Sequence, residues 1–196
     1  TQGVSSAASD VYKRQLLEGI KDTLYMTLTS TLIGYVIGLP MGILLTVTDK
    51  DGIHPNTAVY KVLDVIANLI RSVPFLILLI VLIPFTRFLI GRSYGPTATI
   101  VPLVIAAAPY IARMVESSLK EVDAGVIEAA RSMGASNFTI VTKVMLVEAR
   151  TSLIVGATIS LGTILGYSAM AGTVGGGGLG DIAIRYGYTR WQTDIM

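Results

Sequence analysis

Residues 23–48 read TLYMTLTSTLIGYVIGLPMGILLTVT and contain no formally charged side chain. Two further runs without formal charge cover residues 93–112 and 151–180. An α-helix rises 1.5 Å per residue, so about 20 apolar residues suffice to cross the ~30 Å hydrocarbon core of a bilayer. Each of the three runs therefore has the length and composition of a membrane span.

The overall composition agrees with these runs. Hydrophobic residues make up 52% of the chain of 196 residues, charged residues make up 14%, and the mean hydropathy is +0.66. Soluble domains carry about 25% charged residues. The composition excludes a disordered chain, a coiled coil and an ordinary water-soluble enzyme, and it predicts an all-α, polytopic membrane protein.

Charge and reactive residue types exclude further functions. The net charge of +2 is too balanced for a nucleic-acid-binding domain, so we expect no nucleic-acid partner. The chain has no Cys and one His, which excludes thiol chemistry and leaves too few ligands for a His-based metal cluster. We predict no catalytic residue and no metal ligand.

The chain divides into four predicted spans, at about residues 24–47, 59–84, 97–114 and 152–170. Residues 1–15 are polar and rich in Ser and Ala, and we interpret them as a disordered lead or a remnant of cloning. Residues 16–196 then form one transmembrane domain. The polar tail closes with Trp191, a residue type of membrane interfaces, as if another helix should begin. We therefore expect a fifth helix to be missing after this tail.

The first span carries small residues at a spacing of four, Gly34, Gly38 and Gly42, with Pro40 among them. Small residues let helices approach closely in lipid, where no hydrophobic force draws them together. Pro40 should kink the helix, because it removes a backbone donor and crowds the preceding turn. We interpret this pattern as a helix–helix seam, with a gating hinge as the alternative.

The second span is interrupted by Arg71-Ser72-Val73-Pro74. A charged side chain inside the membrane is costly, so it normally faces protein or water. Arg71 therefore either pairs with Asp64, two turns earlier on about the same helical face, or marks a helix end near the interface. We assign Arg71, Pro74 and Pro40 structural roles within the membrane.

Residues 120–147 form the most informative segment. Asp123 can cap a first short helix, Gly134 can supply the left-handed turn that ends it, and Ser136 can cap a second helix. Apolar residues recur at helical spacing on both helices. The two stripes are Val122, Val126, Ala130 and Met133, and then Phe138, Val141 and Met145. This hairpin is too polar for lipid, so it must pack on something outside the bilayer.

The hairpin carries a family resemblance. Glu128-Ala129-Ala130, followed by Gly134 and then Val144-x-Leu146, resembles the EAA loop of ABC importer permeases. The family pattern ends in Leu-Pro, whereas Val147 follows Leu146 here, which departs from the sharp entry into the fourth span.

Further stretches resemble the methionine-importer type of these permeases, a type with five helices. The resemblance starts near Leu16 and runs through the rest of the chain. The stretches are Gly38-Leu39-Pro40, Arg71-Ser72-Val73-Pro74-Phe75, Ile83-Pro84-Phe85-Thr86-Arg87, Ala107-Ala108-Pro109-Tyr110-Ile111-Ala112-Arg113-Met114-Val115-Glu116 and Gly166-Tyr167-Ser168-Ala169-Met170.

The resemblance implies a type I ABC importer permease fold in the bacterial inner membrane, crossing it several times. It further implies a homodimer with a partner ATPase subunit, and an external methionine-binding protein that is periplasmic or lipid-anchored. The hairpin would lie on the cytoplasmic side and dock into the ATPase. The implied docking residues are Glu128, Ala129, Ala130, Arg131, Met133, Gly134, Ser136 and Phe138.

The same resemblance suggests a role in the translocation pathway for the end of the fourth span. Met170 is either a core-filling residue or, with its copy in a second subunit, a gate on the translocation pathway. Tyr167 and Ser168 belong to this gate or pathway assignment. No Gly-x-x-x-x-Gly-Lys-Ser/Thr motif is present, so we expect a separate chain to bind and hydrolyse ATP, with no cofactor and no enzymatic activity in this one.

Other interpretations stay open beside the methionine permease. The chain could import another amino acid or an osmolyte, or it could be an ion-coupled secondary carrier or channel, although three of its spans lack an acidic residue or His at mid-membrane. Ser117-x-x-Lys120 has the spacing of a serine–lysine hydrolase. Gly175-x-Gly177-x-x-Gly180 fits a dinucleotide fingerprint, but no strand precedes it, so it predicts a flexible external loop.

Overall fold

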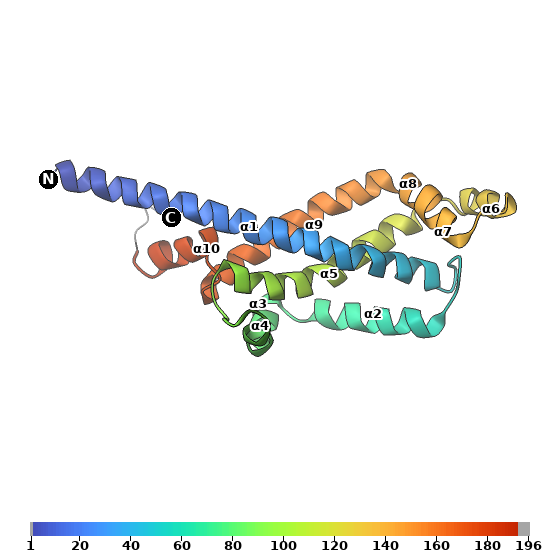
Figure 1. The fold of residues 1–196 in the computed structure, drawn as a ribbon, viewed down its shortest axis with the longest axis horizontal. Helices are drawn as coiled ribbons and strands as arrows, with labels where there is room; N and C mark the ends of the chain where they lie inside the picture. Colours follow the sequence, from blue (N-terminus) through green and yellow to red (C-terminus); the bar gives the residue numbers. More distant parts are fainter. Residues whose placement is uncertain (1, 192–196) are drawn as a thin grey trace. The chain divides into compact units, whose positions relative to one another are not determined.

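The computed structural model describes the backbone of residues 2–191 and the side chains of residues 12–191. These residues form helices joined by short turns, with no strand among them, so the all-α prediction is confirmed (Figure 1). The α-helices are α1 (Gln2–Thr48), α2 (Thr57–Ser72), α3 (Phe75–Val81), α4 (Ile83–Ile90), α5 (Pro96–Lys120), α6 (Ala124–Ser132), α7 (Asn137–Thr139), α8 (Leu146–Glu148), α9 (Arg150–Ala171) and α10 (Gly178–Ile182). Two π-helices (Ile140–Met145 and Ala183–Tyr188) and a 3-10 helix (Gly172–Val174) complete the described part of the chain.

Helix α1 begins earlier than the sequence suggested. We expected a disordered lead over residues 1–15, whereas the structure continues the helix back to Gln2; Thr1 lies outside the described residues. Residues 4–15 contain neither Gly nor Pro, so no residue there interrupts a helix that the apolar segment nucleates. The helix also runs without a break through Pro40.

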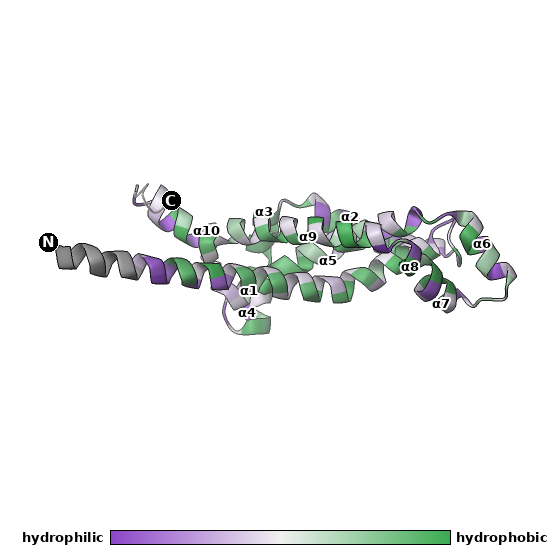
Figure 2. Cartoon of the chain, turned by 90° about the horizontal axis from the view of Figure 1, so that it is seen from above, coloured by the Kyte–Doolittle hydropathy of each residue, from purple (hydrophilic) through white to green (hydrophobic). Residues whose placement is uncertain are grey.

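Within the described residues, three helical segments are long and apolar enough to cross a membrane: Tyr12–Thr48, Pro96–Lys120 and Arg150–Val174. Helices α2 and α3 add a fourth only if they are counted together as one broken span or re-entrant loop. Figure 2 shows the hydrophobic residues recurring along these helices, whereas α6 and α7 mix hydrophilic and hydrophobic residues. The fifth helix that we expected after Trp191 falls outside the described residues.

The predicted second span is divided among three helices. Helix α2 ends at Ser72, and Val73 takes an extended conformation with φ −85° and ψ 125°. Proline disfavours a helical conformation in the residue before it, so Pro74 ends α2 and then serves as the N-cap of α3. The expected structural role of Pro74 is therefore a helix boundary.

Two compact units make up the chain. Unit 1 comprises Thr1–Thr31, Pro74–Val104 and Gly162–Met196; unit 2 comprises Leu32–Val73 and Ile105–Leu161. Helices α1, α5 and α9 each contribute residues to both units.

A close seam between α1 and α5 forms the core of unit 2. A Cβ atom on Gly38 would lie 2.7 Å from the carbonyl oxygen of Ala108, and one on Gly42 would lie 2.6 Å from that of Ala112. Side chains there would collide with backbone, so only glycine permits this approach. The predicted helix–helix seam is confirmed, and its partner is α5.

In unit 1, the glycine-rich segment after α9 is a hydrogen-bonded part of the packing. The amide of Gly176 donates to Ala171 O at 2.9 Å, and the amide of Leu179 donates to Thr23 Oγ1 on α1, also at 2.9 Å. The amide of Gly95 donates to Gly175 O at 2.9 Å. The expectation of a flexible loop is therefore wrong: side-chain-free backbone can pack tightly and satisfy its polar groups within the protein.

Candidate functional site

The hairpin between α5 and α9 is built by three local devices that the sequence predicted. The Asp123 carboxylate accepts the Gly125 amide at 2.7 Å and caps α6. Gly134 has φ +81°, the left-handed conformation that ends a helix without a Cβ clash. The Ser136 hydroxyl accepts the Thr139 amide at 3.3 Å and caps α7. The predicted caps and turn are confirmed.

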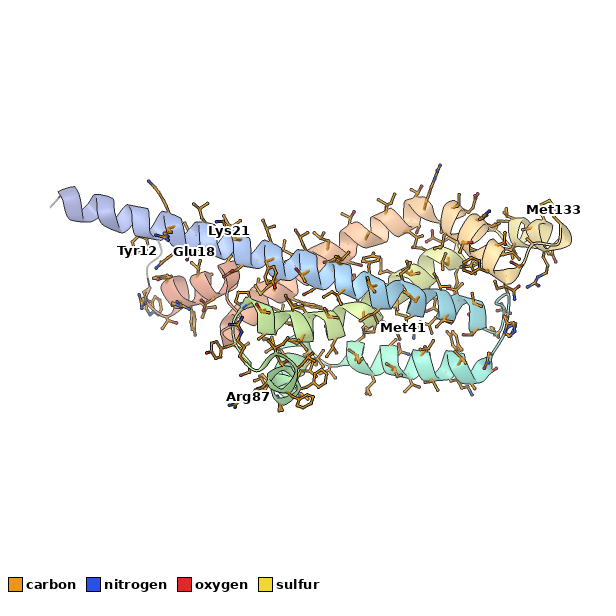
Figure 3. The ribbon with its side chains drawn as sticks, in the orientation of Figure 1. Tyr12, Glu18, Lys21, Met41, Arg87 and Met133 are labelled. Atoms are coloured by element: carbon orange, nitrogen blue, oxygen red, sulfur yellow. The ribbon has the colours of Figure 1, made fainter. Side chains whose placement is uncertain are left out.

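The two apolar stripes of the hairpin divide into a buried part and an exposed part. Ala130, Val141 and Met145 are buried. Met133, which follows the last turn of α6 (Figure 3), is 82% exposed, and Phe138 on α7 is 76% exposed. The structure thus separates a buried base of the hairpin from an exposed apolar tip.

The remaining predicted docking residues lie on the same hairpin, and two of them, Glu128 and Arg131, also line the cavity described below. Glu128, Ala129, Arg131, Gly134 and Ser136 are all exposed. The Arg131 guanidinium donates to the carbonyl of Ile53 at 2.8 Å, which ties α6 to the loop between α1 and α2.

A cavity of about 700 Å³ lies between that loop, the end of α5 and α6. Leu119, Ile127 and Met145 supply apolar lining, and charged side chains surround them. The cavity leaves unfilled space between the hairpin, the end of α5 and the loop after α1.

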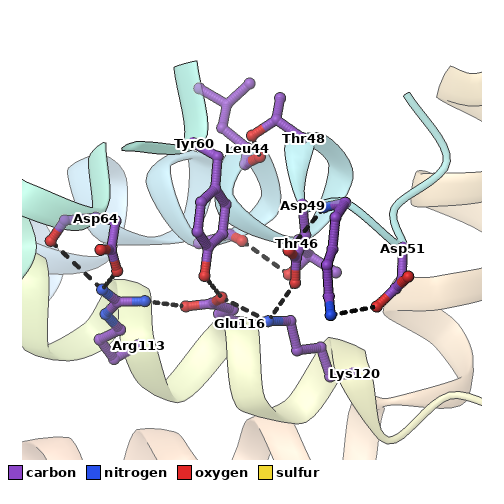
Figure 4. Close-up of polar contacts among 12 residues, drawn as sticks. Leu44, Thr46, Thr48, Asp49, Asp51, Tyr60, Asp64, Arg113, Glu116 and Lys120 are labelled. Atoms are coloured by element: carbon purple, nitrogen blue, oxygen red, sulfur yellow. Dashed lines mark hydrogen bonds and ion pairs between the residues drawn. The ribbon is translucent and has the colours of Figure 1, made fainter. Parts of the chain in front are cut away.

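Beside this cavity, a polar network that the sequence did not predict joins α5 to α2 and to the residue after α1 (Figure 4). Arg113 on α5 binds Asp64 on α2 and donates to Glu116 at 2.7 Å. Lys120 donates to Glu116 at 2.8 Å and to Asp49, just after α1, at 2.7 Å. Glu116 is 5% exposed and lies at the centre of the network.

A signal for part of this network is present in the sequence. Arg113, Glu116 and Lys120 are spaced three and four residues apart, so they share one face of α5 and alternate in sign. Their partners on α1 and α2 follow no local rule. The Lys120 ammonium, by hydrogen bonding, holds the pKa of the Asp49 carboxyl below its usual value.

Arg71 marks a helix end. It is exposed in the last turn of α2, where a basic side chain complements the helix dipole, and Asp64 binds Arg113 instead. Of the two interpretations given above, the helix-end interpretation fits the structure, and the pairing with Asp64 does not.

The residues assigned to the gate lie in different surroundings within unit 1. Ser168 is buried and donates to the carbonyl of Leu165 at 2.7 Å, and the Thr27 hydroxyl donates to it at 3.4 Å. The Tyr167 ring stacks on Phe75 with a centroid distance of 4.6 Å. Met170, by contrast, is 47% exposed in the single chain.

Apolar helices long enough to cross a membrane, joined by an exposed and mixed-polarity hairpin, are the pattern of a polytopic membrane protein. Residues 34–193 match the family described as binding-protein-dependent transport system inner membrane component. The chain belongs to this family and is a permease subunit of an ABC transporter.

Individual relatives carry names that are more specific than the family description. The chain is 48% identical over 181 residues to the probable D-methionine transport system permease protein MetI of Vibrio cholerae, covering 92% of this chain and 80% of the relative. It is 52% identical over 157 residues to the D-methionine transport system permease protein MetI of Escherichia coli, covering 80% and 72%.

Solved structures give the same picture of the fold. A chain from the inward-facing MetNI methionine ABC transporter matches with a TM-score of 0.90 and 49% identity, covering 92% of this chain and 86% of that one. A chain from an amino acid ABC transporter with histidines matches with a TM-score of 0.74 and 22% identity, which shows a shared fold alone.

Proposed function

We propose that this chain is the permease subunit of an ATP-driven importer of methionine in the bacterial inner membrane. The relatives at about 50% identity that carry the name of a D-methionine permease support this substrate. An external methionine-binding protein would deliver the ligand, and a second copy of the chain would complete the pathway.

The exposed apolar tip of the hairpin is the observation that carries the docking proposal. Two large apolar side chains, Met133 and Phe138, lie exposed beside the polar groups of Glu128 and Arg131. Aromatic anchors surrounded by charged side chains are typical of protein-binding hot spots. The partner is an ATPase subunit that binds and hydrolyses ATP, because this chain contains no phosphate-binding loop.

Replacement of Phe138 by Ala tests this docking site. The variant should weaken binding of the ATPase subunit by roughly tenfold or more. Loss of an aromatic side chain that becomes buried in a complex costs about 2 kcal/mol of binding free energy. Phe88→Ala is the matched control, since Phe88 on α4 is 87% exposed and lies outside the hairpin. Co-purification and titration with the ATPase measure both variants.

Uptake of radiolabelled L- and D-methionine tests the substrate, in vesicles that contain the chain and its ATPase and are supplied with the external methionine-binding protein. Unlabelled methionine should compete, and a different amino acid or an osmolyte should not. Wild-type ATPase affinity in Phe138→Ala would overturn the docking site, and uptake of another solute in place of methionine would overturn the substrate.

A further inference from the structure

The end of α5 is the only stretch of chain that leads from the membrane-spanning helices into the start of the hairpin. Helix α5 ends at Lys120, and α6 begins at Ala124 after three linking residues. Any displacement of α6 is therefore passed to the last two turns of α5. These turns carry Arg113, Glu116 and Lys120.

The three side chains bind groups outside α5. Lys120 reaches Asp49 in the loop that follows α1, while Arg113 reaches Asp64 on α2. The hydroxyl of Tyr60 on α2 donates to Glu116 at 3.4 Å. The end of α5 is thus joined by directed polar contacts to the end of α1 and to α2.

Forming these contacts requires free energy to remove charged groups from water, and breaking them leaves a buried charge without its partner. Glu116 and Arg113 are largely withdrawn from water, and the Arg113 Nε is buried without a hydrogen-bond partner. A buried ion pair adds little net stability compared with an apolar replacement, but loss of one partner leaves an uncompensated charge. Such a network therefore adds little to the stability of the fold. Its main effect is to resist separation of the segments that it joins.

We propose that Arg113, Glu116 and Lys120 are positioning residues that carry the movement of the hairpin to α1 and α2. The proposal rests on the docking function proposed above. When the ATPase moves α6, the ion pairs make the end of α1, the end of α5 and α2 move together as one body. The adjoining cavity leaves room for the hairpin to tilt. Because the network joins the end of α5 to α1 and α2, these segments move when the hairpin moves.

The proposal predicts a separation of docking from transport. Lys120→Met removes the donor shared by Asp49 and Glu116 and leaves the tip with Met133 and Phe138 unchanged. ATPase binding and ATP hydrolysis should stay near wild-type levels, while methionine taken up per ATP hydrolysed should fall roughly tenfold, within the usual range of coupling energies. Lys61→Met, at an exposed position on α2, is the matched control.

Two further variants distinguish coupling from folding. Lys120→Arg keeps the charge and both acceptors within reach, so it should retain most of the coupling. Asp49→Asn removes the negative charge that pairs with Lys120 at the edge of the network, so it serves if Lys120→Met fails to assemble; it should lower uptake per ATP without loss of ATPase binding.

A chemical tether gives a readout that a folding role would not change. The chain has no Cys, so Asp49→Cys combined with Lys120→Cys introduces one pair of thiols into each copy of the chain. Once the complex is assembled with an ATPase whose own thiols are removed, a short, reducible bifunctional thiol reagent should restore uptake per ATP. Reduction of the reagent should abolish it again.

The outcomes are separable from those of the docking test. Full uptake per ATP in both Lys120→Met and Asp49→Asn, or no recovery with the tether, would overturn the positioning role and leave the docking site intact. Loss of ATPase binding in Asp49→Asn, or in a Lys120→Met chain that still folds and assembles, would also overturn it, because the network would then belong to docking. A wild-type chain that binds no ATPase would overturn the proposed function itself.

Discussion

At the residue scale, the pair of Asp49 and Lys120 illustrates how a surface loop is held to a membrane helix. The carboxylate lies just beyond the end of α1, and the ammonium lies at the end of α5. The Lys120 ammonium stabilises the charged form of Asp49, so the pKa of this carboxyl is lower in the folded protein than in the unfolded chain.

The direction of this pKa shift gives a pH prediction. A carboxyl with a lowered folded pKa contributes stability that is present above its unfolded pKa of about 4 and is lost as the pH falls through the folded value. The melting temperature of the wild type should exceed that of Asp49→Asn at pH 7. The difference should shrink steadily as the pH is lowered from about 5 to about 3.

Thermal melts of both proteins in one detergent across this pH range measure the effect. The melting temperature of Lys61→Met should change with pH in the same way as that of the wild type. A gap between wild type and Asp49→Asn that grows on acidification would contradict the assigned stabilisation.

At the element scale, the glycines of α1 set how closely α5 can approach. A Cβ on Gly42 would lie 2.6 Å from the backbone oxygen of Ala112, and backbone cannot move aside as the end of a flexible side chain can. Gly156 on α9 offers a contrast, because a Cβ there would meet Met114 at 3.6 Å, an ordinary van der Waals distance.

Gly42→Ala and Gly156→Ala should therefore have opposite effects. The first should lower the free energy of unfolding by about 1–3 kcal/mol through overpacking. The second should be neutral or stabilising by up to about 1 kcal/mol, because Ala is the better helix former. Thermal melting in detergent measures both variants, and equal melting temperatures would contradict the close seam.

The hairpin shows how far sequence patterns determine an element. Asp123, Gly134 and Ser136 act on amides or dihedral angles within a few residues, so their roles follow from spacing alone. The exposure of Met133 and Phe138 was not predictable in this way, because an apolar periodicity does not reveal whether another segment of the chain covers it.

At the scale of the whole molecule, transport needs surfaces that a single chain leaves open. We propose that Met170 is such a position, because it is exposed at the end of α9, whereas Ser168, two residues earlier, is buried. A flexible thioether can close an apolar passage and withdraw again without leaving a polar group unsatisfied. Two copies of Met170, one from each subunit, could form such a gate in the homodimer proposed above.

Met170→Ala tests the gate in the assembled transporter. The variant should raise solute leak or ATP hydrolysis in the absence of substrate, because the shorter side chain cannot close the passage. Ile154→Ala, at an exposed position on the same helix, serves as the control. Leak and basal ATPase activity at wild-type levels in Met170→Ala would remove Met170 from the gate.

The sequence by itself determined the helical, membrane-spanning class, the caps and turn of the hairpin, and the family. These features depend on composition and on residues a few positions apart, so no knowledge of long-range approach is needed. Only the tertiary structure decided that Arg113 binds Asp64, 49 positions away, that Lys120 binds Asp49, and that the glycine-rich segment is packed. The physical reason is that such contacts form only when separate helices come together, and the local sequence carries no record of which partner will be near.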